Sequence, residues 1–259
     1  MVDLFKSLEN KLKQKNISSI HEAINLQNDV KILSESKPLD CWKKLWDKPL
    51  YSNVRAGPSH SDKWVNQFIN IGINEEFKNF INESKFKVTK LQNDFIFHGE
   101  LGEKINRAKL EKKLTVAKRR VYSIYSAAKM LNKRVQINEN FPFFDITGGI
   151  DKLEDNINTL LSELRINNKG TGWGSITVCH FLTDFGSAIK PDIHVCRALK
   201  KMNLFLTKKE LPDFEEVIAI NKIVYDLNKK LGDSYSIRYV EKLLMEFSRQ
   251  KLFEIEENN

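Results

Sequence analysis

The chain has 259 residues, of which 41% are hydrophobic and 29% are charged, which is ordinary for a protein that folds in water. No apolar run approaches the length of a membrane span and no secretory signal is evident, so a membrane protein and an exported protein are not expected. The formal net charge of +8 and the isoelectric point near 9.2 favour a polyanionic partner. Three cysteines without a disulfide framework favour a reducing compartment.

The N-terminal part of the chain is predicted to be mainly helical. Amphipathic patterns cover residues 4–15 and 20–33, and a short helix with two tryptophans is expected over 41–46. Residues 47–62 have the proline and glycine content of a loop. Residues 86–97 have an alternating character, so a short β-hairpin is an open alternative there.

A long basic helix is predicted from Lys104 to Leu131. Most charged runs are solvated helix faces, and contact of some side chains with phosphate groups is the alternative interpretation. Only Glu103 and Glu111 oppose the basic residues of this region, which are Lys104, Arg107, Lys109, Lys112, Lys113, Lys118, Arg119, Arg120, Lys129, Lys133 and Arg134.

After this helix the chain is predicted to form an aromatic and glycine-rich loop over 140–149 and a helix over 151–164. Gly170 and Gly172 then indicate a tight turn ahead of an apolar helix that Gly186 ends. A helix N-terminus behind such a turn offers unpaired N–H groups and the positive end of its dipole to an anion such as phosphate.

Pro191 and Asp192 stand at the start of the next predicted helix, Ile193 to Met202. Asp is a preferred N-cap residue, so capping alone is the simplest interpretation of Asp192. A carboxylate placed beside a bound phosphate is the functional alternative. Two further helices are indicated by apolar positions from Phe214 to Tyr225 and from Ile237 to Phe247.

Taken together, the run Gly-Thr-Gly-Trp-Gly at 170–174 and the run Pro-Asp-Ile-His-Val-Cys-Arg at 191–197 resemble the signature of the helix-hairpin-helix DNA glycosylase superfamily. The resemblance is specific over about thirty residues. Upstream it is looser, and there the basic helix and the helix before the turn match the family's order of elements. It does not extend to the N-terminal part of the chain.

The resemblance implies an all-α fold, with a short β-hairpin at residues 86–97 as the one exception left open. The family has two helical lobes with a cleft between them. Here residues 1–60 would pack with residues 187–259 as one lobe, and residues 61–186 would form the middle lobe that ends in the hairpin.

The resemblance also implies a reaction, which is the hydrolytic excision of a damaged or modified base from double-stranded DNA. Asp192 would be the catalytic carboxylate that stabilises the positive charge developing on the sugar as the base departs. The DNA backbone would be bound by nine residues, which are Lys118, Arg119, Lys169, Gly170, Thr171, Gly172, Trp173, Gly174 and His194. For the side chain of Trp173, anchoring in the core competes with stacking in a base pocket.

One departure from the family concerns the reaction. Gly174 stands where strand-cutting members have a lysine nucleophile, so we expect a monofunctional enzyme that leaves an abasic site. Lys169 and Lys190 are the other amines close in sequence, and contact with phosphate is the simpler role for both.

A second departure concerns metals. Three cysteines are too few for the iron–sulfur cluster of some family members. Cys179 and His180 are adjacent on a helix and point about 100° apart, so they do not converge on a zinc ion, and Cys179 is predicted to be a core residue. No cofactor is expected, apart from a monovalent cation that the hairpin could bind.

Two other functions stay open from the sequence. One is a non-catalytic DNA-binding protein that uses the hairpin as a phosphate clamp, and the other is a helical protein–protein adaptor. For the enzyme, the substrate is open among oxidised purines, alkylated purines, deaminated pyrimidines and modified bases of foreign phage DNA. We expect a monomer without a membrane partner, in the cytoplasm near the nucleoid of a prokaryote or in the nucleus of a eukaryote.

Overall fold

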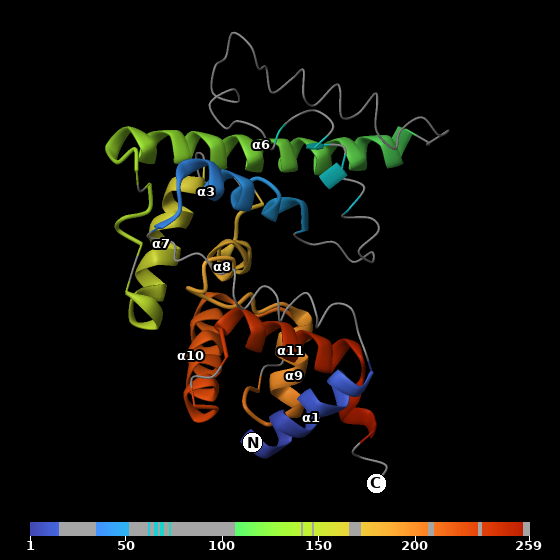
Figure 1. Ribbon diagram of the computed structural model, residues 1–259. Helices are drawn as coiled ribbons and strands as arrows, with labels where there is room; N and C mark the ends of the chain where they lie inside the picture. Colours follow the sequence, from blue (N-terminus) through green and yellow to red (C-terminus); the bar gives the residue numbers. More distant parts are fainter. Residues whose placement is uncertain are drawn as a thin grey trace. The chain divides into compact units, whose positions relative to one another are not determined.

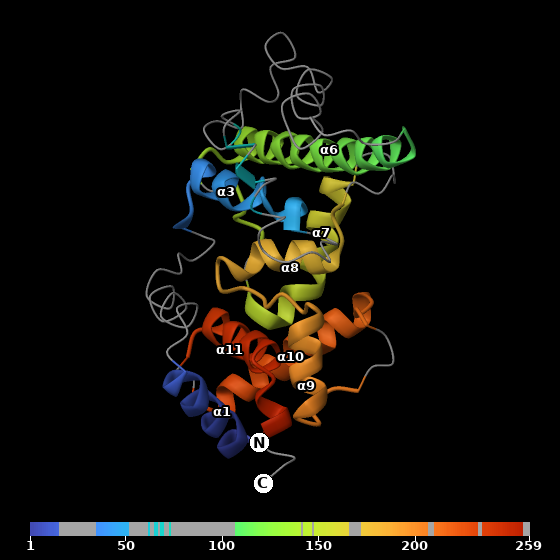
Figure 2. The ribbon, with the colours of Figure 1, turned by 90° about the vertical axis from the view of Figure 1, so that its right-hand side faces the viewer.

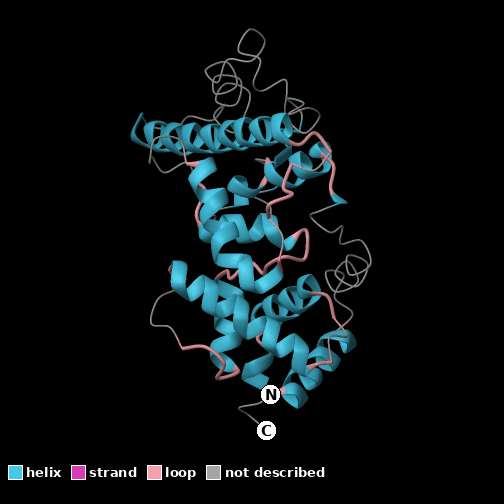
Figure 3. Cartoon of the chain, turned by 90° about the vertical axis from the view of Figure 1, so that its left-hand side faces the viewer, coloured by secondary structure: helices cyan, strands magenta, loops and turns pink. Residues whose placement is uncertain are grey.

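The computed structural model describes residues 1–15, 35–51, 62, 65, 66, 68, 69, 73, 107–140, 142–146, 148–165, 172–206, 210–232 and 235–255, with the side chains of 107–119, 121, 254 and 255 left out. All regular secondary structure within these ranges is helical (Figure 3). This confirms the predicted all-α fold for the described residues. The helix expected at 20–33 and the alternative hairpin at 86–97 lie outside them.

The chain divides into two compact units. The first contains residues 1–33, 146–157 and 178–259, and the second contains 34–145 and 158–177. The N-terminal helix therefore belongs with the C-terminal helices, whereas the sequence-based division also kept residues 34–60 with them. The boundary between the units falls within two helices, α7 (Leu153–Leu164) and α8 (Ser175–Thr183).

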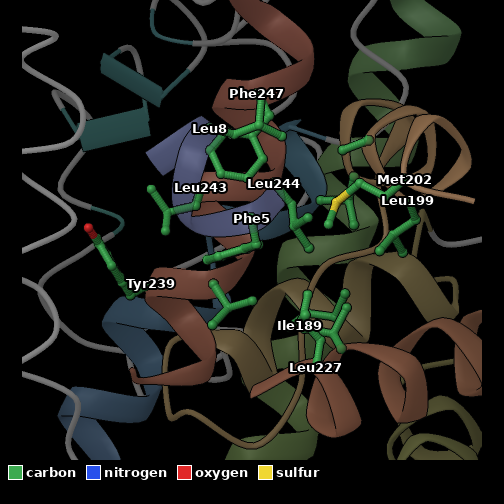
Figure 4. Packing of buried hydrophobic residues seen from close by; sticks show 14 of the residues in the cluster. Phe5, Leu8, Ile189, Leu199, Met202, Leu227, Tyr239, Leu243, Leu244 and Phe247 are labelled. Atoms are coloured by element: carbon green, nitrogen blue, oxygen red, sulfur yellow. The ribbon is translucent and has the colours of Figure 1, made fainter. Parts of the chain in front are cut away.

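The described part of the first unit is built mainly on α1 (Val2–Gln14), α9 (Ile193–Lys201), α10 (Phe214–Lys230) and α11 (Ile237–Arg249). The last of these, α11, packs against α1, α9 and α10 (Figure 1, Figure 2). Each helix has apolar residues at helical spacing, and these side chains meet in one buried cluster that includes Phe5, Leu199 and Leu244 (Figure 4). Helices this short are marginal in isolation, so this shared core provides most of their stability.

A buried carboxylate attaches α1 to the rest of the first unit. Glu9 is 3% exposed, and its two oxygens accept hydrogen bonds from the hydroxyls of Tyr235 (2.8 Å) and Tyr239 (3.0 Å). Lys13 lies 2.7 Å from the same carboxylate. Because a buried charge is costly without partners, these contacts specify where α1 docks.

Capping residues determine where the last two helices begin. Asp213 and Glu216 form a reciprocal capping box at the start of α10. Ser236 caps α11, with its hydroxyl oxygen 3.2 Å from the N–H of Tyr239.

The second unit is built on the long helix α6 (Arg107–Ile137), which packs against α3 (Pro38–Leu45) and the short 3₁₀ helix η2 (Lys48–Tyr51) (Figure 1). The indole N–H of Trp42 on α3 donates to the carbonyl of Ile73 at 2.9 Å. Trp42 is therefore a core residue of the second unit, and Cys41 and Leu45 of the same helix are buried with it.

The C-terminal part of α6 is anchored by an arginine. Arg134 is 5% exposed and pairs with both oxygens of Glu163, at 2.7 and 3.0 Å. The same guanidinium donates to Asp145 (2.7 Å) and to the carbonyl of Pro142 (3.1 Å). The basic run thus ends in a structural ion pair with a buried guanidinium, and for Arg134 the expectation of a solvated or phosphate-binding side chain was wrong.

Candidate functional site

Asp192 begins α9 as its N-cap residue. Its backbone is extended, with φ −77° and ψ 177°, and Oδ1 accepts hydrogen bonds from the main-chain N–H groups of His194 (2.9 Å) and Val195 (3.1 Å). These bonds satisfy two of the unpaired N–H groups at the helix end, so the predicted capping role is confirmed. Among the described residues, Oδ2 has no hydrogen-bond partner, and the side chain is partly exposed. The cap therefore fixes Oδ1, and no described residue pairs with Oδ2.

The loop that leads to Asp192 starts with a tight helix end. Gly186 has φ +66°, its N–H donates to the carbonyl of Thr183, and the N–H of Ser187 donates to the carbonyl of Leu182, both at 3.0 Å. This is the glycine-dependent end of α8 that the sequence predicted. The hydroxyl of Tyr225 donates to the carbonyl of Gly186 at 3.3 Å and ties the turn to α10.

Asn221 on α10 fixes the next part of the loop. Its side chain is fully buried, its Oδ1 accepts from the N–H of Ile189 (2.7 Å), and its Nδ2 donates to the carbonyls of Val217 (2.9 Å) and Ile189 (3.4 Å). Ile189 lies three residues before Asp192, so this clamp sets the path of the chain into the N-cap. The sequence reasoning missed it, although a polar residue at the apolar spacing between Val217 and Val224 was an available signal.

A buried ionic cluster belongs to the same part of the first unit. The Arg238 guanidinium binds Glu241 (Nη1 to Oε2, 2.9 Å) and Asp184 (Nη2 to Oδ1, 3.7 Å). Burial raises the pKa of Glu241, Arg238 and Lys190 oppose this shift, and Asp192 adds to it. Asp192 therefore lies close enough for its charge to act on a second, buried carboxyl group.

His194 lies in the first turn of α9, directly after the cap. Its ring nitrogen Nδ1 is 3.5 Å from the hydroxyl of Ser248 on α11. Burial lowers the pKa of His194 below its ordinary value, and the nearby Asp192 carboxylate opposes this shift. The structure brings His194 and Asp192 together at one helix start, and contact of His194 with DNA stays a prediction.

The described part of the predicted hairpin is Gly172 to Gly174, in the second unit. Gly172 has φ +83°, a conformation that favours glycine, as the sequence predicted. Trp173 is 4% exposed, and its indole N–H donates to the carbonyl of Ser123 on α6 at 2.9 Å. The Trp173 side chain is therefore a core anchor and is not free to stack on a base or to contact the DNA backbone. Predicted contacts at Lys169, Gly170 and Thr171 lie outside the described residues.

The basic helix contributes less exposed charge than its sequence indicates. Lys118 and Arg119 lie on α6, and their side chains are outside the described ones. The neighbouring Arg120 is only 8% exposed, whereas Lys129 and Lys133 are exposed. The run is therefore not one continuous solvated face.

The three cysteines are free and buried. Cys179 is completely buried beside the Asn221 amide, so its predicted core role is confirmed. Burial raises the pKa of Cys41 and of Cys196 to about 12 and also raises that of Cys179, so the thiols stay protonated and poorly reactive. In the part of the chain that the structure describes, no group of three His, Cys, Asp or Glu side chains is arranged to hold a metal ion.

The two halves of the sequence signature belong to different units, with Asp192 and His194 in the first and Gly172 to Gly174 in the second. No protein-family model, curated protein or solved structure matches this chain. None of the described helices is long and apolar enough to span a membrane. The function is therefore inferred from the residues of the site.

Proposed function

We propose that the chain is a monofunctional DNA glycosylase that excises a damaged or modified base from double-stranded DNA and leaves an abasic site. The observation that carries this proposal is the Asp192 carboxylate. One of its oxygens is fixed by two main-chain N–H groups, and the other has no hydrogen-bond partner among the described residues. A carboxylate held in this way is organised in advance to stabilise positive charge that develops in a transition state.

In the proposed reaction the N-glycosidic bond breaks, and the base leaves with the bonding electrons. The Asp192 carboxylate stabilises the positive charge on the sugar and orients a water molecule, whose oxygen bonds to C1′. The proton lost by the water is balanced by the proton that the departing base takes up. Glycine at position 174 offers no amine for a Schiff base, so the DNA strand stays intact.

The rest of the chain is consistent with this role. The net charge of +8 suits a polyanionic partner, and the clamp at Ile189 holds the chain that leads into the catalytic cap. We propose that the enzyme acts as a monomer, in the cytoplasm near the nucleoid or in a nucleus. Its substrates would be damaged bases or, alternatively, modified bases of foreign phage DNA.

Base release is the direct test. Duplexes with oxidised, alkylated, deaminated and phage-type modified bases are incubated with the protein and then heated in alkali, which cuts at abasic sites. We expect release from at least one duplex and a loss of about 10²- to 10⁴-fold in rate for Asp192→Asn. Since Asn caps helices about as well as Asp, this variant should melt like the wild type, and any loss of rate is then chemical.

Two other outcomes assign the protein to another class. The first is a non-catalytic DNA-binding protein, which releases no base but binds duplex DNA with strong salt dependence. In that case Asp192→Asn should bind normally, and Gly172→Glu should abolish binding. If no salt-dependent affinity for DNA is found, the adaptor hypothesis replaces both.

A further inference from the structure

The start of α9 and the end of α11 meet on the surface of the first unit. The contact between His194 Nδ1 and Ser248 Oγ, at 3.5 Å, joins these two helix ends. Arg197 follows His194 on α9 by about one helical turn, and Arg249 follows Ser248 on α11. The side chain of Arg197 is 58% exposed and that of Arg249 is 37% exposed, so both guanidinium groups reach solvent.

Both arginines belong to the two helix ends that the contact between His194 and Ser248 joins. The pKa of His194 is lowered first by burial, is raised by Asp192, and is lowered further by the charges of Arg249 and Arg197. Charges act on an imidazole in this way only from nearby. The contact between His194 and Ser248 therefore brings the end of α11, with Arg249, to the first turn of α9, which begins at the Asp192 cap and is followed by Arg197.

The acidic partners of these arginines leave most of their positive charge in place. Arg197 lies 3.9 Å from Glu210, and both side chains are more than half exposed, so this pair contributes little. Arg249 lies 3.4 Å from Glu246, a carboxylate that also pairs with Lys242 at 3.7 Å. One buried carboxylate thus faces two cations. It orients Arg249 without neutralising the surface.

We propose that Arg197 and Arg249 bind phosphate groups of the DNA strand whose nucleotide reaches Asp192. This inference rests on the proposed function and adds a backbone-binding pair in the first unit to the contacts predicted for the hairpin in the second. The planar guanidinium fork matches the oxygens of a phosphodiester. Two contacts of this kind beside the cap hold the sugar-phosphate backbone, so the sugar stays at the carboxylate while the base departs.

The test measures binding separately from chemistry. Fluorescence anisotropy gives the affinity of the full chain for a duplex with a tetrahydrofuran abasic-site analogue, which has no base to release, from about 50 to about 200 mM salt. Arg197→Gln and Arg249→Gln should each reduce the slope of log K against log salt by about 0.9, and the double variant by about 1.8. Arg197→Lys and Arg249→Lys keep the charge and should keep the slope.

Lys230→Gln, which removes one exposed positive charge from the last turn of α10, is the matched control. The proposal is overturned if both arginine variants keep the wild-type slope, or if Lys230→Gln lowers it as much as they do. Thermal melting confirms that the variants are folded. If the slopes fall as expected but the wild type releases no base from any duplex, the phosphate-binding pair stands and the glycosylase proposal alone fails.

Discussion

The surroundings of Asp192 and those of Trp173 are stabilised by different kinds of contact. Asp192 and the loop before it are held by hydrogen bonds to main-chain groups, from the cap itself and from Asn221. Trp173 is held by burial of a large aromatic side chain and by one hydrogen bond to Ser123. Polar contacts therefore position the candidate catalytic group, whereas apolar packing positions the turn.

This difference predicts two kinds of mutational effect. Changes at the polar contacts of the first unit should alter the rate of base release by more than their cost in stability explains, because they move a reacting group. Changes at the turn of the second unit should act mainly through stability, because the anchor is part of a core. Single variants at each position, measured for stability and for base release, separate these two effects.

Trp173→Ala should have the largest effect on stability. It removes a buried aromatic side chain and leaves a cavity, so we expect a loss of about 3–5 kcal/mol in the free energy of unfolding, measured by urea denaturation. Trp173→Phe should cost only about 1 kcal/mol, since the Ser123 carbonyl keeps a hydrogen bond from the Ser126 hydroxyl at 2.8 Å. Wild-type stability of Trp173→Ala would show that this side chain is not a core anchor.

Asn221→Leu should combine a loss of stability with a loss of activity. It leaves the buried N–H and C=O of Ile189 without their side-chain partner, which should cost about 2–4 kcal/mol and lower kcat for base release by about 10- to 100-fold, with KM little changed. Asn228→Leu is the matched control, because Asn228 lies on the same helix and donates to Tyr235 instead. Equal effects of the two variants on kcat would rule out a positioning role for Asn221.

Gly172→Ala should destabilise the second unit by about 1–3 kcal/mol. The residue has φ +83°, and a Cβ atom there would lie 2.7 Å from the Ser123 hydroxyl oxygen. Gly174→Ala is the control in the same turn, because its Cβ would meet no atom within 4 Å. A melting temperature of Gly172→Ala equal to that of Gly174→Ala would contradict the requirement for glycine at position 172.

Local features of both regions could be predicted from the sequence. The cap at Asp192, the helix that follows it and the glycine end of α8 depend on residues within a few positions, and the structure confirms all three. The long helix and the C-terminal helices follow from apolar spacing in the same way. These elements are determined by backbone hydrogen bonds and by one amphipathic face each.

Contacts between distant residues could not be predicted. Asn221 and Ile189 are 32 residues apart, and Trp173 and Ser123 are 50 apart. Arg134 belongs by sequence to a basic run expected to be exposed, but its guanidinium is buried and pairs with Glu163, 29 residues away. A single chain shows which residues are polar at buried positions, but the fold decides which partner each one meets.

Glu241→Gln tests the smallest effect, which is a dependence of stability on pH. Burial raises the pKa of Glu241 above the ordinary value of 4.5, so the folded protein binds this proton more tightly than the unfolded chain. As pH rises through the window above that ordinary value, the unfolded chain loses its proton first, and the contribution of Glu241 to stability falls. The glutamine variant lacks this titration. The free energy of unfolding of the wild type, measured relative to the variant, should therefore decrease from about pH 4 to about pH 7.

Glu215→Gln changes an exposed glutamate of α10 and is the control for the loss of one negative charge. A difference between wild type and Glu241→Gln that is constant with pH would mean that Arg238 and Lys190 balance burial at this carboxyl group, and one that grows with pH would mean that they outweigh it.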